Sequence, residues 1–88
     1  MLGLTKNAAL EHAGDLVRVT AVGPGFIATP LLEANLDREA REQIAAGHAL
    51  NRLGTSEEVA NLVAFLASDA ATFITGSYHL VDGGDAAR

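Results

Sequence analysis

Two short stretches of the chain are apolar, rich in β-branched residues and followed by glycine. Residues 16–22 read Leu-Val-Arg-Val-Thr-Ala-Val and precede Gly23-Pro24-Gly25, while residues 77–82 precede Gly83-Gly84. β-Branched residues fit an extended backbone, and glycine and proline tend to end it. The pattern therefore predicts a β-strand at each place.

Two other stretches have helical patterns. Residues 2–13 are rich in Ala and Leu and contain no proline, and Gly14 follows where a helix C-cap glycine belongs. Residues 37–46 are polar and helical in pattern, and Gly47 is expected to end them. The first of these helices begins without an N-cap residue before it, so we expect its true start to lie upstream of Met1.

A capping box, Thr55-Ser56-Glu57-Glu58, predicts the start of a third helix. In this motif the Thr55 side chain accepts from the Glu58 backbone N–H, and the Glu58 side chain accepts from the Thr55 backbone N–H. Apolar residues then recur at i, i+3, i+4 and i+7 and form one stripe: Val59, Leu62, Val63 and Leu66. The predicted order is helix, strand, lid-like insert, helix, strand. A strand–helix–strand unit implies parallel strands, and two parallel strands are too few for a stable sheet. We expect an α/β fold, the end of a doubly wound parallel sheet whose first half is absent.

Composition narrows the class further. The 88 residues allow one small domain, 49% are hydrophobic, and the net charge is −5 with scattered basic residues, which argues against a nucleic-acid or anionic-membrane surface. There is no cysteine, so disulfides and thiolate metal sites are excluded. The longest apolar run, residues 62–67, is far below the roughly 18 residues of a membrane span, and no signal-peptide pattern is present. We expect a cytoplasmic protein.

Several blocks, in the same order along the chain, resemble the short-chain dehydrogenase/reductase family. Residues 18–30 are similar to its "RVNxxxPGxxxT" segment and residues 52–60 to its "RxGxPEEVA" segment. Shorter matches are Gly3-Leu4-Thr5-Lys6, Phe65-Leu66-Ala67-Ser68-Asp69, Ile74-Thr75-Gly76 and Val81-Asp82-Gly83-Gly84. The resemblance implies the C-terminal part of a Rossmann-like fold and a parent enzyme that uses NAD or NADP.

The activity that the resemblance implies is reversible hydride transfer between the nicotinamide cofactor and an alcohol or carbonyl substrate. A tyrosine would serve as general acid and base, with a lysine lowering its pKa. In the family this Tyr-x-x-x-Lys pair, the catalytic Ser and the Gly-rich nucleotide fingerprint all precede the block that matches Gly3. None of them is in this sequence. We therefore expect no catalytic residue in this chain and no turnover by the chain alone.

The resemblance assigns roles to the remaining segments. Residues 23–30, after the first strand, would meet the nicotinamide, with Pro24-Gly25 ending the strand, backbone groups of Ile27 holding the carboxamide and the Thr29 hydroxyl assisting. Gly25 would allow close approach of a ring, because it has no Cβ. An ordinary turn after a strand is the alternative. Residues 31–53 would form the substrate lid; a surface helical hairpin with core leucines is equally compatible.

The final helix and strand lie in residues 55–84. Because the last helix and strand of this family commonly form subunit interfaces, we expect a homo-oligomer through residues 59–82. A different class of function stays open, that of a non-catalytic self-association or interaction module from a truncated relative. Retention or absence of the upstream Tyr-x-x-x-Lys segment discriminates between the two.

Other motifs are rejected. Residues 23–28 fit G-x-G-x-x-[GA] by letter, but Pro24 and Pro30 do not suit a loop that opens directly into a helix. Tyr78 is followed four residues later by Asp82 and not by lysine, which favours a partly buried strand tyrosine. Ser77, His79 and Asp82 lack a G-x-S-x-G elbow. His12, His48 and His79 have no metal-binding spacing, so no metal site is expected.

Overall fold

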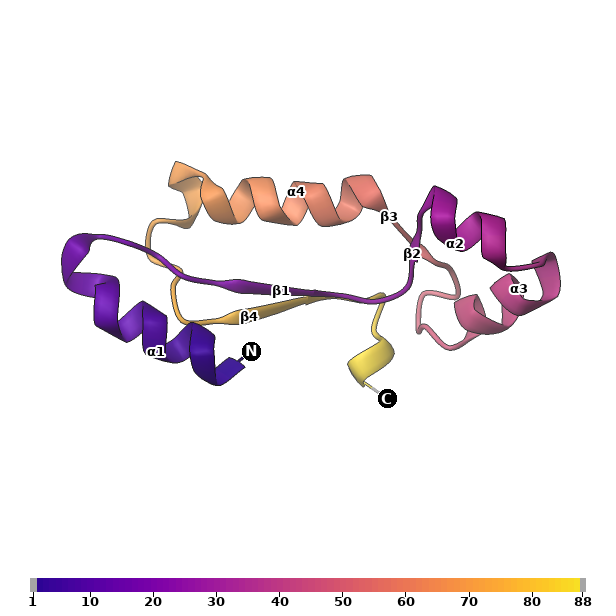
Figure 1. The fold of residues 1–88 in the computed structure, drawn as a ribbon, viewed down its shortest axis with the longest axis horizontal. Helices are drawn as coiled ribbons and strands as arrows, with labels where there is room; N and C mark the ends of the chain where they lie inside the picture. The colour runs from indigo at the N-terminus through magenta and orange to yellow at the C-terminus, as the bar shows by residue number, and fades with distance from the viewer. Residues whose placement is uncertain (1, 88) are drawn as a thin grey trace.

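The computed structural model describes residues 2–87, which fold into an elongated body of 50 × 23 × 20 Å. Strand β1 (Ala21–Pro24) pairs in parallel with β4 (Tyr78–Val81), and α1 (Leu2–His12) and α4 (Ser56–Ala67) lie on opposite sides of this pair (Figure 1). Helices α2 (Pro30–Asn35) and α3 (Arg38–Ala46) gather at the far end of the molecule. The predicted α/β order of helix, strand, insert, helix, strand is confirmed.

Two very short strands tie the insert to the body. Strand β2 (Ile27–Ala28) pairs in parallel with β3 (Gly54–Thr55), and the Gly54 N–H donates to the Phe26 carbonyl at 3.0 Å. The sequence analysis did not predict this second sheet, because two residues carry no periodicity. Its consequence is that both ends of the insert meet at one point.

The first strand lies further along the chain than predicted for residues 16–22. Its ladder runs from Ala21 to Pro24, because the register places Ala21 opposite Tyr78, the first residue of β4. Leu16 has a φ of 61° and belongs to a turn instead. Val19 contacts the loop before β4, where its N–H donates to Thr75 Oγ1 at 3.0 Å. The second strand falls inside its predicted range, 77–82.

The end of α1 also differs from the prediction. The helix ends at His12 and continues as a 3₁₀ turn, η1 (Ala13–Asp15), so Gly14 lies inside this turn and is not the C-cap. The left-handed residue that ends the turn is Leu16, whose N–H donates to the Ala13 carbonyl. At α3 the prediction holds, because Gly47 follows the last helical residue.

Side-chain caps start three of the helices. Thr29, Asp37 and Thr55 each accept a hydrogen bond from a backbone N–H of the first turn, at the starts of α2, α3 and α4. At α4 the predicted capping box is complete: Glu58 N–H donates to Thr55 Oγ1 at 3.1 Å, and Thr55 N–H donates to Glu58 Oε1 at 3.0 Å. Further 3₁₀ turns follow α4 (η2, Asp69–Ala71) and β4 (η3, Asp85–Ala87).

The buried apolar core is small. Among the described residues its members are Ala9, Ala21, Leu66 and Ala71. The α4 stripe is only partly covered, since Leu66 is 5% exposed while Val63 is 49% exposed. Many large apolar side chains therefore remain on the surface of the described residues.

Candidate functional site

The site is built around the segment that follows β1. The Gly25 N–H donates to the Val81 carbonyl at 3.1 Å, which continues the β1–β4 pairing one residue past the strand. A Cβ on Gly25 would lie 2.9 Å from Asp82 Cα and 3.0 Å from His48 Nε2. A residue with a Cβ would crowd Asp82 and His48 at these distances, so the packing within this chain already favours glycine at position 25.

Three of the four predicted site residues line one hollow, here called the loop pocket. It has a volume of about 370 Å³ and lies between the segment after β1 and helix α2. Its lining residues are Gly25, Phe26, Ile27, Thr29, Leu31, Leu32, Asn35 and Leu36. Pro24 is not among them, since it is the last residue of β1 and pairs with Val81. The pocket wall carries no ionisable side chain.

Thr29 is fixed by its role as a helix cap. Its Oγ1 accepts from the Leu32 N–H at 3.2 Å, and Pro30 follows as the first residue of α2. Proline suits this position, because its missing N–H would have no partner in the first turn of a helix. The Thr29 hydroxyl acts as an acceptor in this bond and keeps its hydrogen for another partner.

The backbone polar groups of Ile27 are not used in the β2–β3 ladder. In a parallel ladder, successive residues turn their N–H and C=O groups to opposite sides. Because the Phe26 carbonyl accepts from Gly54, the polar groups of Ile27 point away from β3. The Ile27 side chain instead covers Gly54, where an added Cβ would lie 2.7 Å from Ile27 Cδ1.

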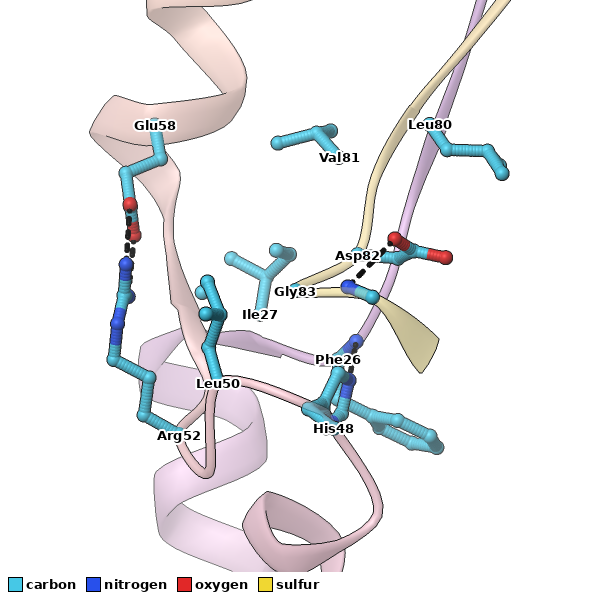
Figure 2. Close-up of a pocket in the computed structure, with 12 residues that line it drawn as sticks. Phe26, Ile27, His48, Leu50, Arg52, Glu58, Leu80, Val81, Asp82 and Gly83 are labelled. Carbon is cyan, nitrogen blue, oxygen red and sulfur yellow. Dashed lines mark hydrogen bonds and ion pairs between the residues drawn. The ribbon is translucent and has the colours of Figure 1, made fainter. Parts of the chain in front are cut away.

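A second hollow of about 270 Å³, here called the histidine pocket, shares Phe26 and Ile27 with the loop pocket (Figure 2). His48 is its buried polar residue, and the Phe26 N–H donates to His48 Nε2 at 3.3 Å. The other lining residues are Ile27, Leu50, Arg52, Gly54, Glu58, Leu80, Val81, Asp82, Gly83 and Gly84. Sequence reasoning weighed His48 only as a metal ligand and missed this contact. No local signal could have revealed it, since the bond joins residues 22 positions apart.

The charged groups of the histidine pocket are paired. Arg52 donates to both carboxylate oxygens of Glu58 at 2.8 Å. This bond, followed by the bond from the Thr55 N–H, lowers the pKa of Glu58 from 4.5 to about 2, and the same pairing raises the pKa of Arg52. The Asp82 carboxylate accepts from the Ala86 and Gly84 N–H groups, and chiefly the first of these bonds holds its pKa below the usual range.

Of the rejected triad, Ser77 and His79 are in contact and Asp82 is bound elsewhere. Ser77 Oγ lies 2.7 Å from His79 Nε2, but Asp82 binds backbone N–H groups and completes no triad with them. Between residues 2 and 87 no three side chains of the metal-binding types gather to hold an ion. Tyr78 is 43% exposed and lies over Gly23. Residues 23–28 run from β1 into β2, and helix α2 begins at Pro30 after the Thr29 cap, so the objection that Pro30 is unsuited to a helix start was wrong. The segment differs from a dinucleotide fingerprint because strand β2 stands between Gly25 and the helix.

Within the described part of the chain no helix has the length and apolar character needed to cross a membrane.

Comparison with known proteins identifies the class. The family model described as enoyl-(acyl carrier protein) reductase matches residues 1–85. A short-chain dehydrogenase family protein from Francisella tularensis superposes over 99% of this chain with a TM-score of 0.89 at 34% identity, covering 40% of that protein. This chain belongs to the short-chain dehydrogenase/reductase family, and its fold is part of the Rossmann fold of that family.

The names of the individual relatives describe a dehydrogenase and a reductase. Over 81 residues the chain is 51% identical to a cyclohexanol dehydrogenase from Acinetobacter sp. (strain SE19), covering 92% of this chain and 31% of that enzyme. It is 46% identical over 84 residues to the 3-oxoacyl-[acyl-carrier-protein] reductase FabG of Thermotoga maritima, covering 96% of this chain and 34% of that enzyme. The structure of ElxO with NADP bound matches with a TM-score of 0.91 and 37% identity, over 99% of this chain and 36% of ElxO. The chain thus spans about a third of the length of these curated relatives.

Proposed function

We propose that this chain forms the C-terminal part of an NAD(P)-dependent oxidoreductase that acts on an alcohol or carbonyl substrate. In this proposal residues 23–30 are the nicotinamide loop, residues 31–53 the substrate lid, and residues 55–84 the final helix and strand of one domain. The observation that carries it is the loop pocket, which Gly25, Ile27 and Thr29 all line. The resemblance to a cyclohexanol dehydrogenase and to NADP-bound ElxO supports the substrate class and the cofactor.

The chemistry of the pocket fits a nicotinamide ring. Gly25 lines the pocket without a side chain, and Leu31, Leu32 and Leu36 contribute apolar lining. The carboxamide has both a donor and an acceptor, which the outward-facing backbone groups of Ile27 and the free hydrogen of Thr29 complement. When bound, the cofactor supplies or accepts the hydride. The residues of this chain then bind and orient the ring and exclude water from it.

The proton step needs groups that this pocket lacks. The single tyrosine of the sequence is Tyr78, on β4, and the single lysine is Lys6, in α1. They are not spaced as Tyr-x-x-x-Lys, and neither lines the loop pocket. We propose that the catalytic pair is supplied by sequence that the relatives carry outside the matched third, and that the 88-residue chain alone turns over no substrate.

A chimera tests the proposal. The 81 matching residues of the Acinetobacter cyclohexanol dehydrogenase are replaced by those of this chain. We expect the chimera to oxidise cyclohexanol with formation of reduced cofactor, while the purified 88-residue chain shows no protein-dependent cofactor turnover. A folded chimera without activity contradicts the proposed role. Turnover by the chain alone contradicts the need for an external catalytic pair.

A second candidate is a non-catalytic self-association module, and the exposed apolar residues favour it. The segment proposed as a homo-oligomer interface, residues 59–82, carries several of them: Val63, Phe65, Phe73, Tyr78 and Leu80. An inactive chimera together with a well-defined oligomer of the isolated chain would favour this second function.

A further inference from the structure

His48 is held in one tautomer by two backbone groups. Its side chain is almost completely enclosed, with 2% of the residue exposed. Nδ1 lies 3.0 Å from the Ile44 carbonyl oxygen, which can only accept, so Nδ1 carries the hydrogen. The Phe26 N–H can only donate, so Nε2, at 3.3 Å, is the acceptor. The imidazole therefore links the last turn of α3 to the segment after β1.

The space for this ring is made by residues that are distant in sequence. A Cβ on Gly25 would lie 3.0 Å from Nε2, and a Cβ on Gly83 would lie 3.6 Å from His48 Cβ. The Phe26 ring stands edge-on to the imidazole, with centroids 5.9 Å apart and an interplanar angle of 89°. Figure 2 shows His48 and Phe26 meeting beside Gly83. The bond is thus made inside a close-fitting enclosure.

Both polar backbone groups of Phe26 are bound by the returning end of the insert. Its N–H donates to His48, and its carbonyl accepts from the Gly54 N–H at 3.0 Å. These two bonds fix the peptide planes on either side of Phe26. The following residue, Ile27, is thereby oriented with its own polar groups toward the side away from β3.

We propose that His48 is a positioning residue for the cofactor loop. Through the bond to the Phe26 N–H it holds residues 24–29 in the shape that presents Ile27 and Thr29 to the nicotinamide ring. His48 does not line the loop pocket itself and acts through Phe26. This inference rests on the proposed function of that loop.

Two substitutions separate the hydrogen bond from the packing. His48→Asn keeps an amide donor near the place of Nδ1 but has no acceptor within reach of Phe26 N–H. His48→Gln places an amide oxygen as many bonds from Cβ as Nε2 is, and so restores the acceptor. His12→Asn is the matched control, because the His12 side chain is 53% exposed and lies at the end of α1.

The first measurement is amide hydrogen exchange of Phe26 in the cyclohexanol dehydrogenase chimera, read at single-residue resolution by mass spectrometry. The second is steady-state kinetics of the cyclohexanol dehydrogenase chimera. For His48→Asn we expect faster Phe26 exchange and a cofactor KM raised about two- to tenfold, as for the loss of one neutral hydrogen bond. The KM for cyclohexanol should change less. His48→Gln should return both quantities toward the parent values, and His12→Asn should leave them unchanged.

The outcomes separate the inference from the proposed function. Equal losses in His48→Asn and His48→Gln would overturn the positioning role, because they would indicate packing alone. Unchanged Phe26 exchange in His48→Asn would overturn the hydrogen bond itself. An inactive chimera with unaltered His48 would overturn the proposed function, and with it the role of His48 toward the cofactor, even where the exchange result upholds the bond.

Discussion

The Thr29 hydroxyl has one observed role and one proposed role. It accepts from the Leu32 N–H to start α2, and Thr29 lines the loop pocket in which we propose that the nicotinamide binds. A substitution there alters both the helix start and the pocket. The two effects can be separated, because the cap needs an acceptor and the cofactor contact needs a donor.

In the chimera, Thr29→Ala should raise the cofactor KM about two- to tenfold, since a lost hydroxyl contact costs roughly 0.5–1.5 kcal/mol. The fold should be kept, with a loss of about 0.5–2 kcal/mol in stability because the side-chain cap of α2 is removed. Thr29→Ser should be close to the parent. Thr29→Asp keeps a good cap but has no hydrogen to donate. This variant should therefore be as stable as the parent but bind the cofactor more weakly than the parent. Cofactor titrations and thermal melts give the two readings. An unaltered cofactor KM in Thr29→Ala would remove Thr29 from the site.

At Gly25 the constraint is space. Gly25→Ala would place a methyl group 2.9 Å from the Asp82 backbone and 3.0 Å from His48, so something must shift. We expect a loss of about 1–3 kcal/mol in the free energy of unfolding of the chimera. Gly3→Ala is the matched control, because a Cβ there meets nothing within 4 Å and lies in α1. Chemical denaturation of both variants measures the difference, and equal stability would show that the loop gives way freely.

At the scale of elements, α4 depends on an ionised carboxylate at its first turn. Glu58 completes the capping box and receives two bonds from Arg52. Because the pKa of Glu58 is lowered from 4.5 to about 2 in the folded chain, the ionised form stabilises the fold above pH 4.5. That contribution is lost as the pH falls from 4.5 through about 2.

Glu58→Gln should therefore flatten the acid end of the stability profile. The parent chimera should lose stability between pH 4.5 and about pH 2, whereas the variant should be less stable at neutral pH and change less over this interval. Glu57→Gln, one residue earlier and outside the capping box, is the control. Denaturation at a series of pH values provides the test, and parallel profiles for parent and Glu58→Gln would contradict it.

Local signals predicted most of the elements. The capping box fixed the start of α4, and Gly47 marked the end of α3. Helix α2 escaped prediction, although Thr29-Pro30 is a good helix start, because two prolines and a short length favoured a loop. The β2–β3 pair and the His48 bond could not be predicted, since each joins residues that only the folded chain brings together.

At the scale of the molecule, the described residues leave much apolar surface uncovered. Leu16 is 93% exposed and Phe73 is 101% exposed, and a groove of about 380 Å³ lies between residues 18–22 and α4. The sheet containing β1 has two strands, so each strand has one unpaired edge. Open edges and apolar faces recruit other chains.

We therefore expect the isolated chain to self-associate, swap segments or remain partly molten. Light scattering should report particles larger than the 9.1 kDa monomer, and unfolding should lack a sharp cooperative transition. Replacing the fully exposed Phe73 with a polar residue should reduce the particle size. Replacing Glu11, which is exposed and already polar, with the same residue should not. A monodisperse monomer with cooperative unfolding would refute the expectation.

Because β2 pairs with β3, the chain enters and leaves the insert at adjacent positions. Ile27 pairs with Gly54, so helices α2 and α3 belong to one long connection whose two ends are held together by the β2–β3 pairing. The entropic cost of closing such a connection grows only slowly with the number of residues in it. The β2–β3 pairing and the Gly25 backbone lie outside both helices, so a different helix sequence could change the lining of the loop pocket, provided that it keeps a carbonyl in the place of the Ile44 carbonyl that holds His48. Under the proposed function, such a change would alter which substrates fit and leave the nicotinamide loop as it is.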